Sequence, residues 1–120
     1  MRILVIDDSK PMRRLVLRTL RDSGYGDNDF QEASNGLEAL EIIESFHPEL
    51  ILADWNMPQM DGLELLKELN RIESKIPFGF VTSEQSDEMR GLASENGALF
   101  LIGKPFSVEL FQEALSDIIK

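Results

Sequence analysis

The sequence contains no cysteine and only one histidine, one tryptophan and one tyrosine. Without cysteine the chain cannot form a disulfide framework, a thiolate zinc site or a cysteine nucleophile. Long hydrophobic runs are also absent: the apolar start of the chain, residues 1–6, meets two aspartates at once. Such a run is too short for a signal peptide or a membrane span. We therefore expect a cytoplasmic protein that does not contact membranes.

Positive charge is scarce, with 12 Lys and Arg against 22 Asp and Glu, and the net charge is −10. This overall field has the wrong sign for binding nucleic acid. We attribute most of the acidity to solubility, and some of it to a cation or a basic partner surface. With 120 residues, the chain is expected to form one domain over residues 1–120, large enough to bury a core without staples.

Five β-type runs alternate along the chain with five helical patterns. The predicted strands are Arg2 to Ile6, Asp29 to Ala33, Glu49 to Asp54, Pro77 to Thr82 and Leu99 to Ile102. Four are mostly apolar, as expected for parallel strands covered on both faces, and the more polar second run suits an edge. Strict β-α alternation predicts an α/β fold with an open, doubly wound parallel sheet. Five units are too few for a closed eight-stranded barrel.

Apolar residues at helical spacing mark the five helices between and after these strands. The predicted buried stripes are Met12, Leu15, Val16, Thr19 and Leu20; Leu37, Leu40 and Ile43; Leu63, Leu66 and Leu69; Met89, Leu92 and Ala93; and Val108, Phe111, Leu115 and Ile118. Ser9 and Ser107 suit helix starts, and Gly24 and Gly97 suit helix ends.

Chemically active side chains stand at the ends of four predicted strands. These side chains are Asp7, Asp8, Asp54, Thr82 and Lys104. Taken singly, each has an ordinary explanation as a helix cap, a turn residue or a solvated lysine. Ligands of open α/β sheets bind at the carboxyl ends of the strands, so the fold places all five side chains around one spot.

Three carboxylates in one crevice repel each other by about 4 kcal/mol per pair at about 4 Å and an effective dielectric constant near 20. Lys104 supplies one positive charge, which is too little for three negative ones. A hard divalent cation that prefers oxygen ligands would balance the remaining negative charge, and Mg²⁺ suits a site with few protein ligands. Carboxylates, a lysine, a hydroxyl and Mg²⁺ are also the parts of a phosphoryl-transfer site.

Motifs for other chemistries are missing. The chain has no P-loop, no dinucleotide fingerprint and no G-x-S-x-G elbow. His47, before Pro48, is interpreted as a surface loop residue. Trp55 is interpreted as a packing residue or a partner contact. Arg13 and Arg14 are interpreted as solvated surface, with contact to an acidic partner as the alternative.

Four motifs at the predicted strand ends carry a resemblance to a known family. They are Asp7-Asp8, Asp54-Trp55-Asn56-Met57-Pro58 with Asp61-Gly62, Thr82, and Lys104-Pro105-Phe106. Over its whole length the chain resembles the receiver domains of response regulators, most closely the single-domain chemotaxis type. The resemblance implies a flavodoxin-like sheet of strand order 2-1-3-4-5 with five helices.

The resemblance also implies roles for individual residues. Asp54 is expected to accept a phosphoryl group from a phosphohistidine, forming an acyl phosphate. Asp8, Asp54 and the backbone carbonyl of Asn56 are expected to hold Mg²⁺, with Asp7 acting mainly through water. Lys104 is expected to pair with Asp54 and then with the phosphoryl group.

Three further roles follow from the same resemblance. Thr82 is expected to swing toward a phosphoryl oxygen, and Asn56 and Glu84 to tune the rate of dephosphorylation, with a short-lived phosphorylated state. The family usually has an aromatic switch residue three positions before the lysine. Here this position is Leu101, whereas strand alternation points Phe100 to the opposite face. Coupling through Leu101 is therefore expected to differ.

The implied function is a phosphoacceptor switch of two-component signalling that catalyses only its own phosphorylation and dephosphorylation. Its expected partners are a sensor histidine kinase, a downstream protein such as the flagellar motor switch, and a phosphatase. No DNA-binding output domain is expected in 120 residues. The alternatives are a receiver fragment of a longer regulator, a phosphorelay intermediate, a Mg²⁺-dependent phosphohydrolase and a degenerate receiver used only for binding.

Overall fold

A computed structural model describes residues 1–119, in which five parallel strands form one sheet of order β2-β1-β3-β4-β5. The strands are β1 (Arg2–Ile6), β2 (Asp29–Ala33), β3 (Leu50–Ala53), β4 (Phe78–Thr82) and β5 (Leu101–Gly103). Both the doubly wound architecture and the strand order agree with the sequence-based prediction.

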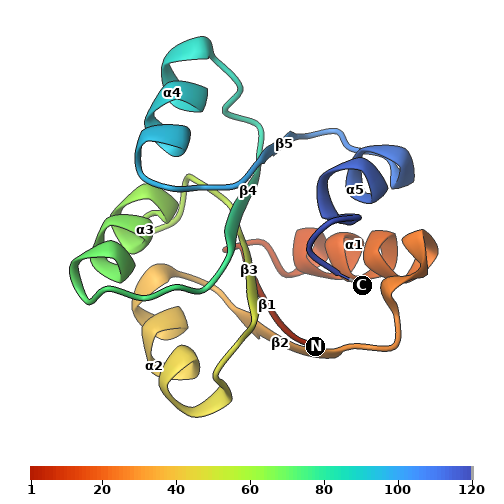
Figure 1. Ribbon diagram of the computed structural model, residues 1–120, viewed down its shortest axis with the longest axis horizontal. Helices are drawn as coiled ribbons and strands as arrows, with labels where there is room; N and C mark the ends of the chain where they lie inside the picture. The colour runs from red at the N-terminus through yellow and green to blue at the C-terminus, as the bar shows by residue number, and fades with distance from the viewer. Residues whose placement is uncertain (120) are drawn as a thin grey trace.

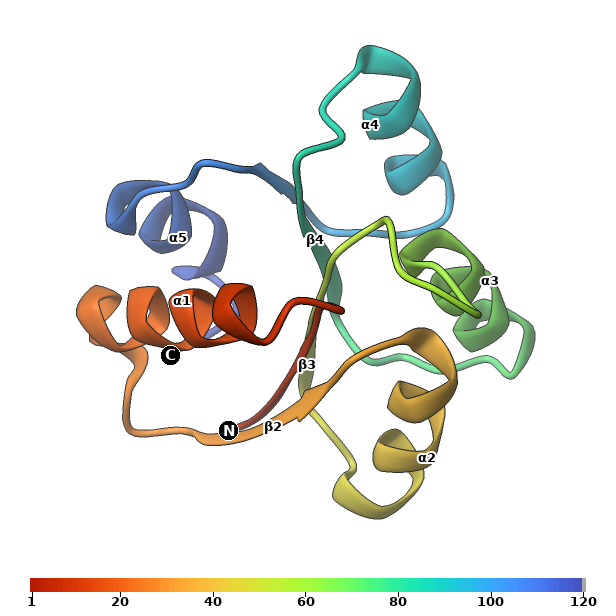
Figure 2. The ribbon, with the colours of Figure 1, turned by 180° about the vertical axis from the view of Figure 1, so that it is seen from behind.

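Helices cover both faces of the sheet (Figures 1 and 2). They are α1 (Lys10–Leu20), α2 (Gly36–Phe46), α3 (Gly62–Arg71), α4 (Asp87–Glu95) and α5 (Val108–Leu115), with a short π-helical turn η1 (Arg21–Tyr25) directly after α1. Helices α2, α3 and α4 lie on one side of the sheet, and α1 and α5 lie on the other. No helix within residues 1–119 is long and apolar enough to cross a membrane.

The sheet separates the core into two hydrophobic clusters. In β1, Leu4 and Ile6 pack with the cluster beneath α2, α3 and α4, whereas Ile3 and Val5 pack with the cluster beneath α1 and α5. All four side chains are at most 1% exposed. This two-sided burial explains why the strand sequences are continuously apolar rather than alternating. In the edge strand β2, by contrast, only Ala33 is buried.

Polar side chains fix the helix starts that the sequence indicates. The hydroxyls of Ser9 and Ser107 accept hydrogen bonds from the first turns of α1 and α5. At the start of α3, the side chain of Asp61 and that of Glu64 form a reciprocal capping box. These caps determine where each helix leaves the strand end that precedes it, and therefore how the loops at this edge of the sheet run.

Three predictions of detail are wrong. β5 was expected over residues 99–102, but the strand runs from Leu101 to Gly103, paired with residues 80–82. Before it, the amide of Leu99 still donates to the carbonyl of Phe78 at 2.8 Å, although the Leu99 side chain is 58% exposed. Leu15 and Leu37 were placed on buried helix stripes, yet they are 46% and 47% exposed. On α1 the buried side is formed by Val16, Thr19 and Leu20, which were also predicted, and on α2 it includes Ala39, which was not.

One glycine contact brings α3 close to the sheet. A Cβ atom at Gly62 would overlap the backbone carbonyl of Asp54 and come within 2.9 Å of the Phe80 ring. The amide of Gly62 also donates to the carbonyl of Trp55 at 2.9 Å. The loop after β3 therefore returns to its own starting point, and α3 begins directly beside the carboxyl end of that strand.

Candidate functional site

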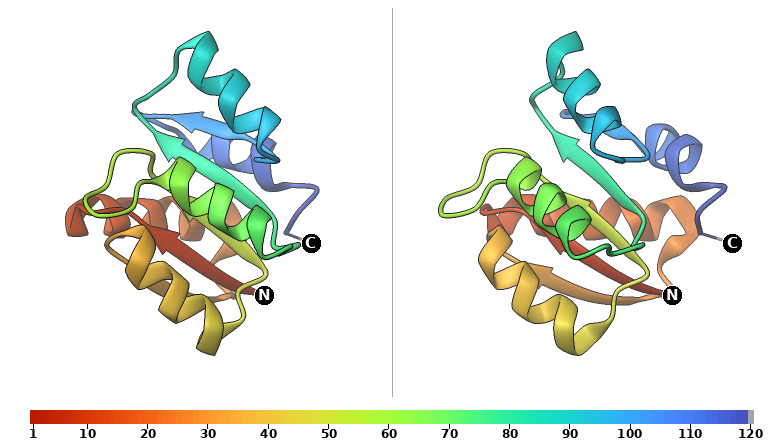
Figure 3. Two further views of the ribbon diagram at one scale, coloured as in Figure 1. Left: turned by 90° about the vertical axis from the view of Figure 1, so that its left-hand side faces the viewer. Right: turned by 60° about the vertical axis from the view of Figure 1, so that its left-hand side comes forward.

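The carboxyl ends of the strands meet at one edge of the sheet, toward which the strand arrows point in Figure 3. Asp7 follows β1 and Asp54 follows β3, and both continue the sheet ladder by one hydrogen bond. The amide of Asp7 donates to the carbonyl of Ala33 at 3.0 Å, and the amide of Asp54 donates to the carbonyl of Ile6 at 2.9 Å. The backbone beneath both carboxylates is therefore held by the sheet rather than by a loop.

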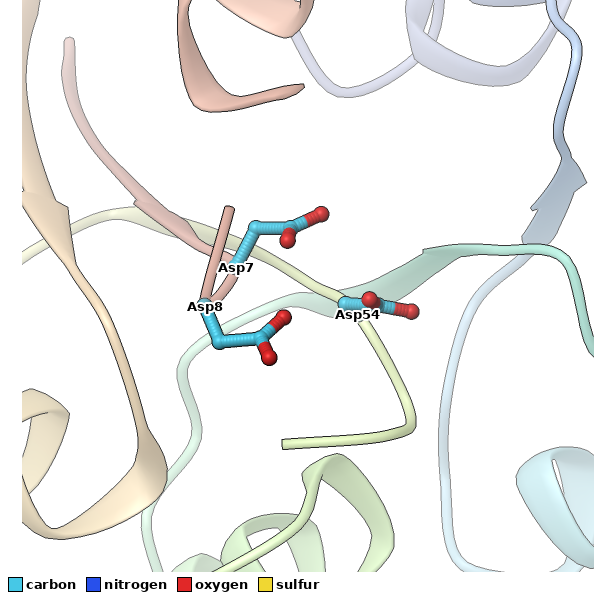
Figure 4. A group of neighbouring side chains, drawn as sticks. All are labelled: Asp7, Asp8 and Asp54. Carbon is cyan, nitrogen blue, oxygen red and sulfur yellow. The ribbon is translucent and has the colours of Figure 1, made fainter. Parts of the chain in front are cut away.

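Three carboxylates converge at this edge (Figure 4). Asp7, Asp8 and Asp54 each offer an oxygen atom, and these three atoms lie within 4.8 Å of one another. Asp7 is 3% exposed and Asp54 is 9% exposed, while Asp8 is open to solvent. The ends of two separate strands thus form a compact acidic cluster that is open to solvent on the side of Asp8.

Lys104, just beyond β5, provides the positive charge. Its Nζ atom lies 2.9 Å from Oδ2 of Asp7 and 3.2 Å from Oδ2 of Asp54. Burial favours a lower pKa for Lys104, but the hydrogen bond to Asp7 and the charges of Asp54 and Asp7 outweigh it and raise the pKa above its ordinary value. The lysine is therefore charged at neutral pH and bridges the two buried carboxylates.

The donor set fits a hard divalent cation. Within residues 1–119, Lys104 pairs with Asp7 and Asp54 and Asp8 forms no ion pair, so one positive charge faces three carboxylates. Oxygen-only ligands with an open side for water are what Mg²⁺ prefers. The acidic cluster can therefore hold a metal ion, and its uncompensated charge favours binding.

Hydrogen bonds from neighbouring amides orient the two buried carboxylates. Oδ1 of Asp54 accepts from the amide of Trp55 at 2.7 Å, and Oδ1 of Asp7 accepts from the amide of Ser9 at 2.9 Å. In each case the other oxygen, Oδ2, contacts Lys104. Because one oxygen is held by the backbone and the other by the lysine, neither carboxylate rotates freely.

The remaining predicted residues lie in the loops around this cluster. Thr82 is fully buried at the end of β4, and its hydroxyl accepts from the amide of Glu84 at 3.3 Å. The side-chain amide of Asn56 donates to Oε1 of Glu84 at 2.9 Å. Among the described residues, neither Thr82 nor the Asn56 side chain hydrogen-bonds to the three carboxylates. The two positions that the resemblance links to dephosphorylation are thus in direct contact.

Trp55 packs inside the protein. It is 4% exposed, and its ring stacks on Phe80 with centroids 4.7 Å apart and planes inclined by 29°. Of the two interpretations from sequence, packing is the one that the structure supports. His47 is exposed, and it ends α2 in a left-handed conformation with φ of 52°, consistent with the predicted surface position.

Arg13 is not the solvated surface residue that the sequence suggested. Its side chain is only 14% exposed, its Nη1 donates to the backbone carbonyl of Asp7 at 2.6 Å, and its Nε pairs with Glu32 at 2.9 Å. The available signal was its position one turn after Ser9, the N-cap of α1, which turns Arg13 back toward the end of β1. Arg14, its neighbour, is exposed as predicted.

Phe100, directly before β5, and Leu101, its first residue, pack on opposite faces of the sheet, as strand alternation predicts. Leu101 packs against the cluster beneath α2, α3 and α4, whereas Phe100 packs against the cluster beneath α1 and α5. A Cβ atom at Gly79 would overlap the Phe100 ring, so this ring lies directly over the glycine. Phe100 is therefore partly buried against the cluster beneath α1 and α5 and does not replace an aromatic side chain at position 101.

Comparison with known proteins identifies relatives over the whole chain. Residues 3–116 match the family described as the response regulator receiver domain. Chemotaxis protein CheY-3 of Vibrio cholerae is 37% identical over 122 residues, covering 100% of this chain and 92% of the relative. A chemotaxis protein CheY homolog of Campylobacter jejuni is also 37% identical, covering 99% of this chain and 92% of the relative.

Solved structures show the same arrangement. The structure of Vibrio cholerae chemotaxis protein CheY4 superposes with a TM-score of 0.83 at 31% identity, covering 98% of this chain and 97% of that one. The receiver domain of the Francisella response regulator 1452 gives a TM-score of 0.85 at 28% identity, covering 97% of this chain and 93% of that one.

Proposed function

Because the chain belongs to the response regulator receiver domain family, we propose that it is a phosphoacceptor switch of two-component signalling, with Asp54 as the acceptor. The observation that carries this proposal is the meeting of three carboxylates and one lysine at the ends of β1, β3 and β5. The full-length relatives are chemotaxis proteins, which supports a chemotaxis-type output.

In the proposed reaction, an oxygen of the Asp54 carboxylate attacks the phosphorus of a phosphohistidine on a sensor histidine kinase. The bond between phosphorus and the imidazole nitrogen breaks, the nitrogen keeps the electron pair and takes up a proton, and a phosphorus–oxygen bond forms on Asp54. The product is an acyl phosphate. Hydrolysis of that bond returns the carboxylate and releases inorganic phosphate, which closes the cycle.

The chain's own residues provide orientation and charge for this step. The amide of Trp55 fixes one Asp54 oxygen at 2.7 Å, so the other oxygen, 3.2 Å from Lys104, is the one we assign as nucleophile. Lys104 can move its charge from the carboxylate to the incoming phosphoryl group. We assign Mg²⁺ to Asp8, Asp54 and the carbonyl of Asn56, with Asp7 acting through water; when bound, the ion neutralises charge on the phosphoryl oxygens.

Two loop contacts suggest how the switch is read and reset. Thr82 holds its hydroxyl toward the amide of Glu84, and we propose that it turns toward a phosphoryl oxygen on Asp54. The pair formed by Asn56 and Glu84 lies beside the same site, and we assign to it control of the rate of hydrolysis. A downstream protein, such as a flagellar motor switch, would then bind one loop arrangement better than the other.

The test is phosphorylation by acetyl phosphate, a small phosphodonor, followed by intact mass. In Mg²⁺ buffer the protein should gain one phosphoryl group and change Trp55 fluorescence, because Trp55 follows Asp54 directly and its backbone amide donates a hydrogen bond to the Asp54 carboxylate. Asp54→Asn should gain none, whereas Asp22→Asn, which changes an exposed carboxylate on η1, should behave as wild type. A phosphoryl group that still appears on Asp54→Asn, or none on the wild type, would refute the assignment.

A further inference from the structure

The loop between β4 and α4 is tied to the turn after β5 by one side chain. Nε2 of Gln85 donates a hydrogen bond to the backbone carbonyl of Lys104 at 3.2 Å. The amide group of Gln85 lies over Gly103, where a Cβ atom would overlap all three of its terminal atoms. The contact therefore needs two residues: a glutamine that reaches across and a glycine that leaves the space.

Space is the only reason the structure gives for glycine at position 103. Positive φ angles occur at Gly24 and Gly97 among the glycines of the described chain, and Gly103 does not have one. Any residue could adopt its backbone conformation, so the conformational freedom of glycine is not what the position requires. A side chain at position 103 would instead occupy the space that the Gln85 amide fills.

This contact joins two parts of the proposed phosphoacceptor site. Lys104, whose carbonyl accepts the bond, extends its ammonium group to Asp7 and Asp54. Gln85 follows Glu84 in the loop, and the amide of Glu84 bonds to the hydroxyl of Thr82. In this arrangement the Thr82 hydroxyl forms no hydrogen bond with Asp54. The Gln85 contact therefore holds the loop in a state in which the Thr82 hydroxyl is turned away from Asp54.

We propose that Gln85 is a positioning residue, which with Gly103 forms a latch that keeps the loop after β4 away from Asp54 until phosphorylation. The inference rests on the proposed phosphoryl transfer to Asp54. Phosphorylation draws Thr82 toward Asp54, and the loop that carries Gln85 must leave the Lys104 carbonyl. The latch therefore opposes phosphorylation of Asp54. Its loss increases the fraction of molecules in which the loop after β4 is free to move toward Asp54.

The test is a double-mutant cycle on Gln85 and Gly103, measured as the rate of phosphorylation by acetyl phosphate in Mg²⁺ buffer. Gln85→Ala removes the hydrogen bond, and Gly103→Ala displaces the flexible Gln85 amide without touching the backbone of the site. Each single variant should react about two- to tenfold faster than wild type, the range that one hydrogen bond allows. The double variant should be no faster than either single variant, because both changes break the same contact.

Arg90→Ala is the matched control, because Arg90 donates a comparable bond, at 3.3 Å, to the carbonyl of Leu101 but lies on α4 outside the loop. It should change the rate less than twofold. Urea unfolding of all variants distinguishes a latch from a merely structural contact. If the contact is merely structural, its loss lowers the free energy of unfolding and leaves the phosphorylation rate unchanged. Rates of Gln85→Ala equal to wild type, or additive effects of the two substitutions, would overturn the inference. If wild type itself accepts no phosphoryl group, the proposed function fails instead.

Discussion

Asp8→Asn should stabilise the metal-free protein while abolishing most of its response to Mg²⁺. Asp8 is the exposed member of the acidic cluster and forms no ion pair within residues 1–119, so its charge is repelled by two neighbours and balanced by no adjacent cation. Asparagine keeps the size of the side chain and removes the charge. The higher stability without metal and the weaker response to Mg²⁺ both follow from the loss of one negative charge, so the two results together test the electrostatic argument.

The magnitude follows from the geometry of the cluster. At 4.8 Å, the outer limit of the oxygen separations, two unit charges interact by about 3.5 kcal/mol at an effective dielectric constant of about 20 and by about 0.9 kcal/mol in bulk water. Asp8 is solvent-exposed, so the lower figure applies to each of its two pairs, and salt screens them further. The free energy of unfolding should therefore rise by about 1 kcal/mol in EDTA at ordinary ionic strength.

Urea denaturation in EDTA and in Mg²⁺ measures both effects. Wild type should gain about 2.7 kcal/mol when Mg²⁺ is present at about one hundred times its dissociation constant, whereas Asp8→Asn should gain much less. Glu41→Gln, which removes an equally exposed charge from α2 in a chain of net charge −10, controls for general self-repulsion and should change stability by less than about 0.5 kcal/mol. If Asp8→Asn is no more stable than wild type in EDTA, the three carboxylates do not repel each other as argued.

Two further predictions concern the loops around the site. Gly62→Ala should lower the free energy of unfolding by more than about 2 kcal/mol in urea titrations, because its Cβ would overlap the Asp54 carbonyl, whereas Gly91→Ala, in open space within α4, should raise it by about 0.5–1 kcal/mol. Asn56→Ala and Glu84→Ala should each change the decay rate of the phosphorylated protein, and their effects should not add, because the two side chains bond to each other. Independent effects on decay would show that the contact is not used, and a phosphorylated lifetime of many hours in wild type would contradict a short-lived state.

The sequence predicted the sheet because its strands are buried on both faces. Runs such as residues 2–6 and 78–82 cannot be amphipathic surface segments, and their alternation with helices leaves few topologies. The same logic placed Asp7, Asp54 and Lys104 at one edge. Here the position of each side chain follows from where a strand ends, so no tertiary detail was needed.

Details that depend on how helices and loops pack were not predictable in this way. Leu15 was misplaced because helical spacing admits both it and the adjacent Val16 to one buried stripe, whereas the packing of α1 on the sheet buries only Val16. Arg13 was misread because its partners, the carbonyl of Asp7 and the side chain of Glu32, come from two other elements. The contact of Gln85 with Gly103 likewise joins residues with no pattern between them in the sequence.

The ion pair between Asp7 and Lys104 joins residues 97 positions apart. The carboxylates follow β1 and β3, near the middle of the sheet, whereas their counter-charge arrives only with β5 at its edge. During folding, the acidic cluster therefore gains its ammonium group only after the last strand has docked on β4. A partly folded chain carries the Asp54 carboxylate without the lysine beside it, so the proposed phosphoryl transfer would depend on completion of the sheet.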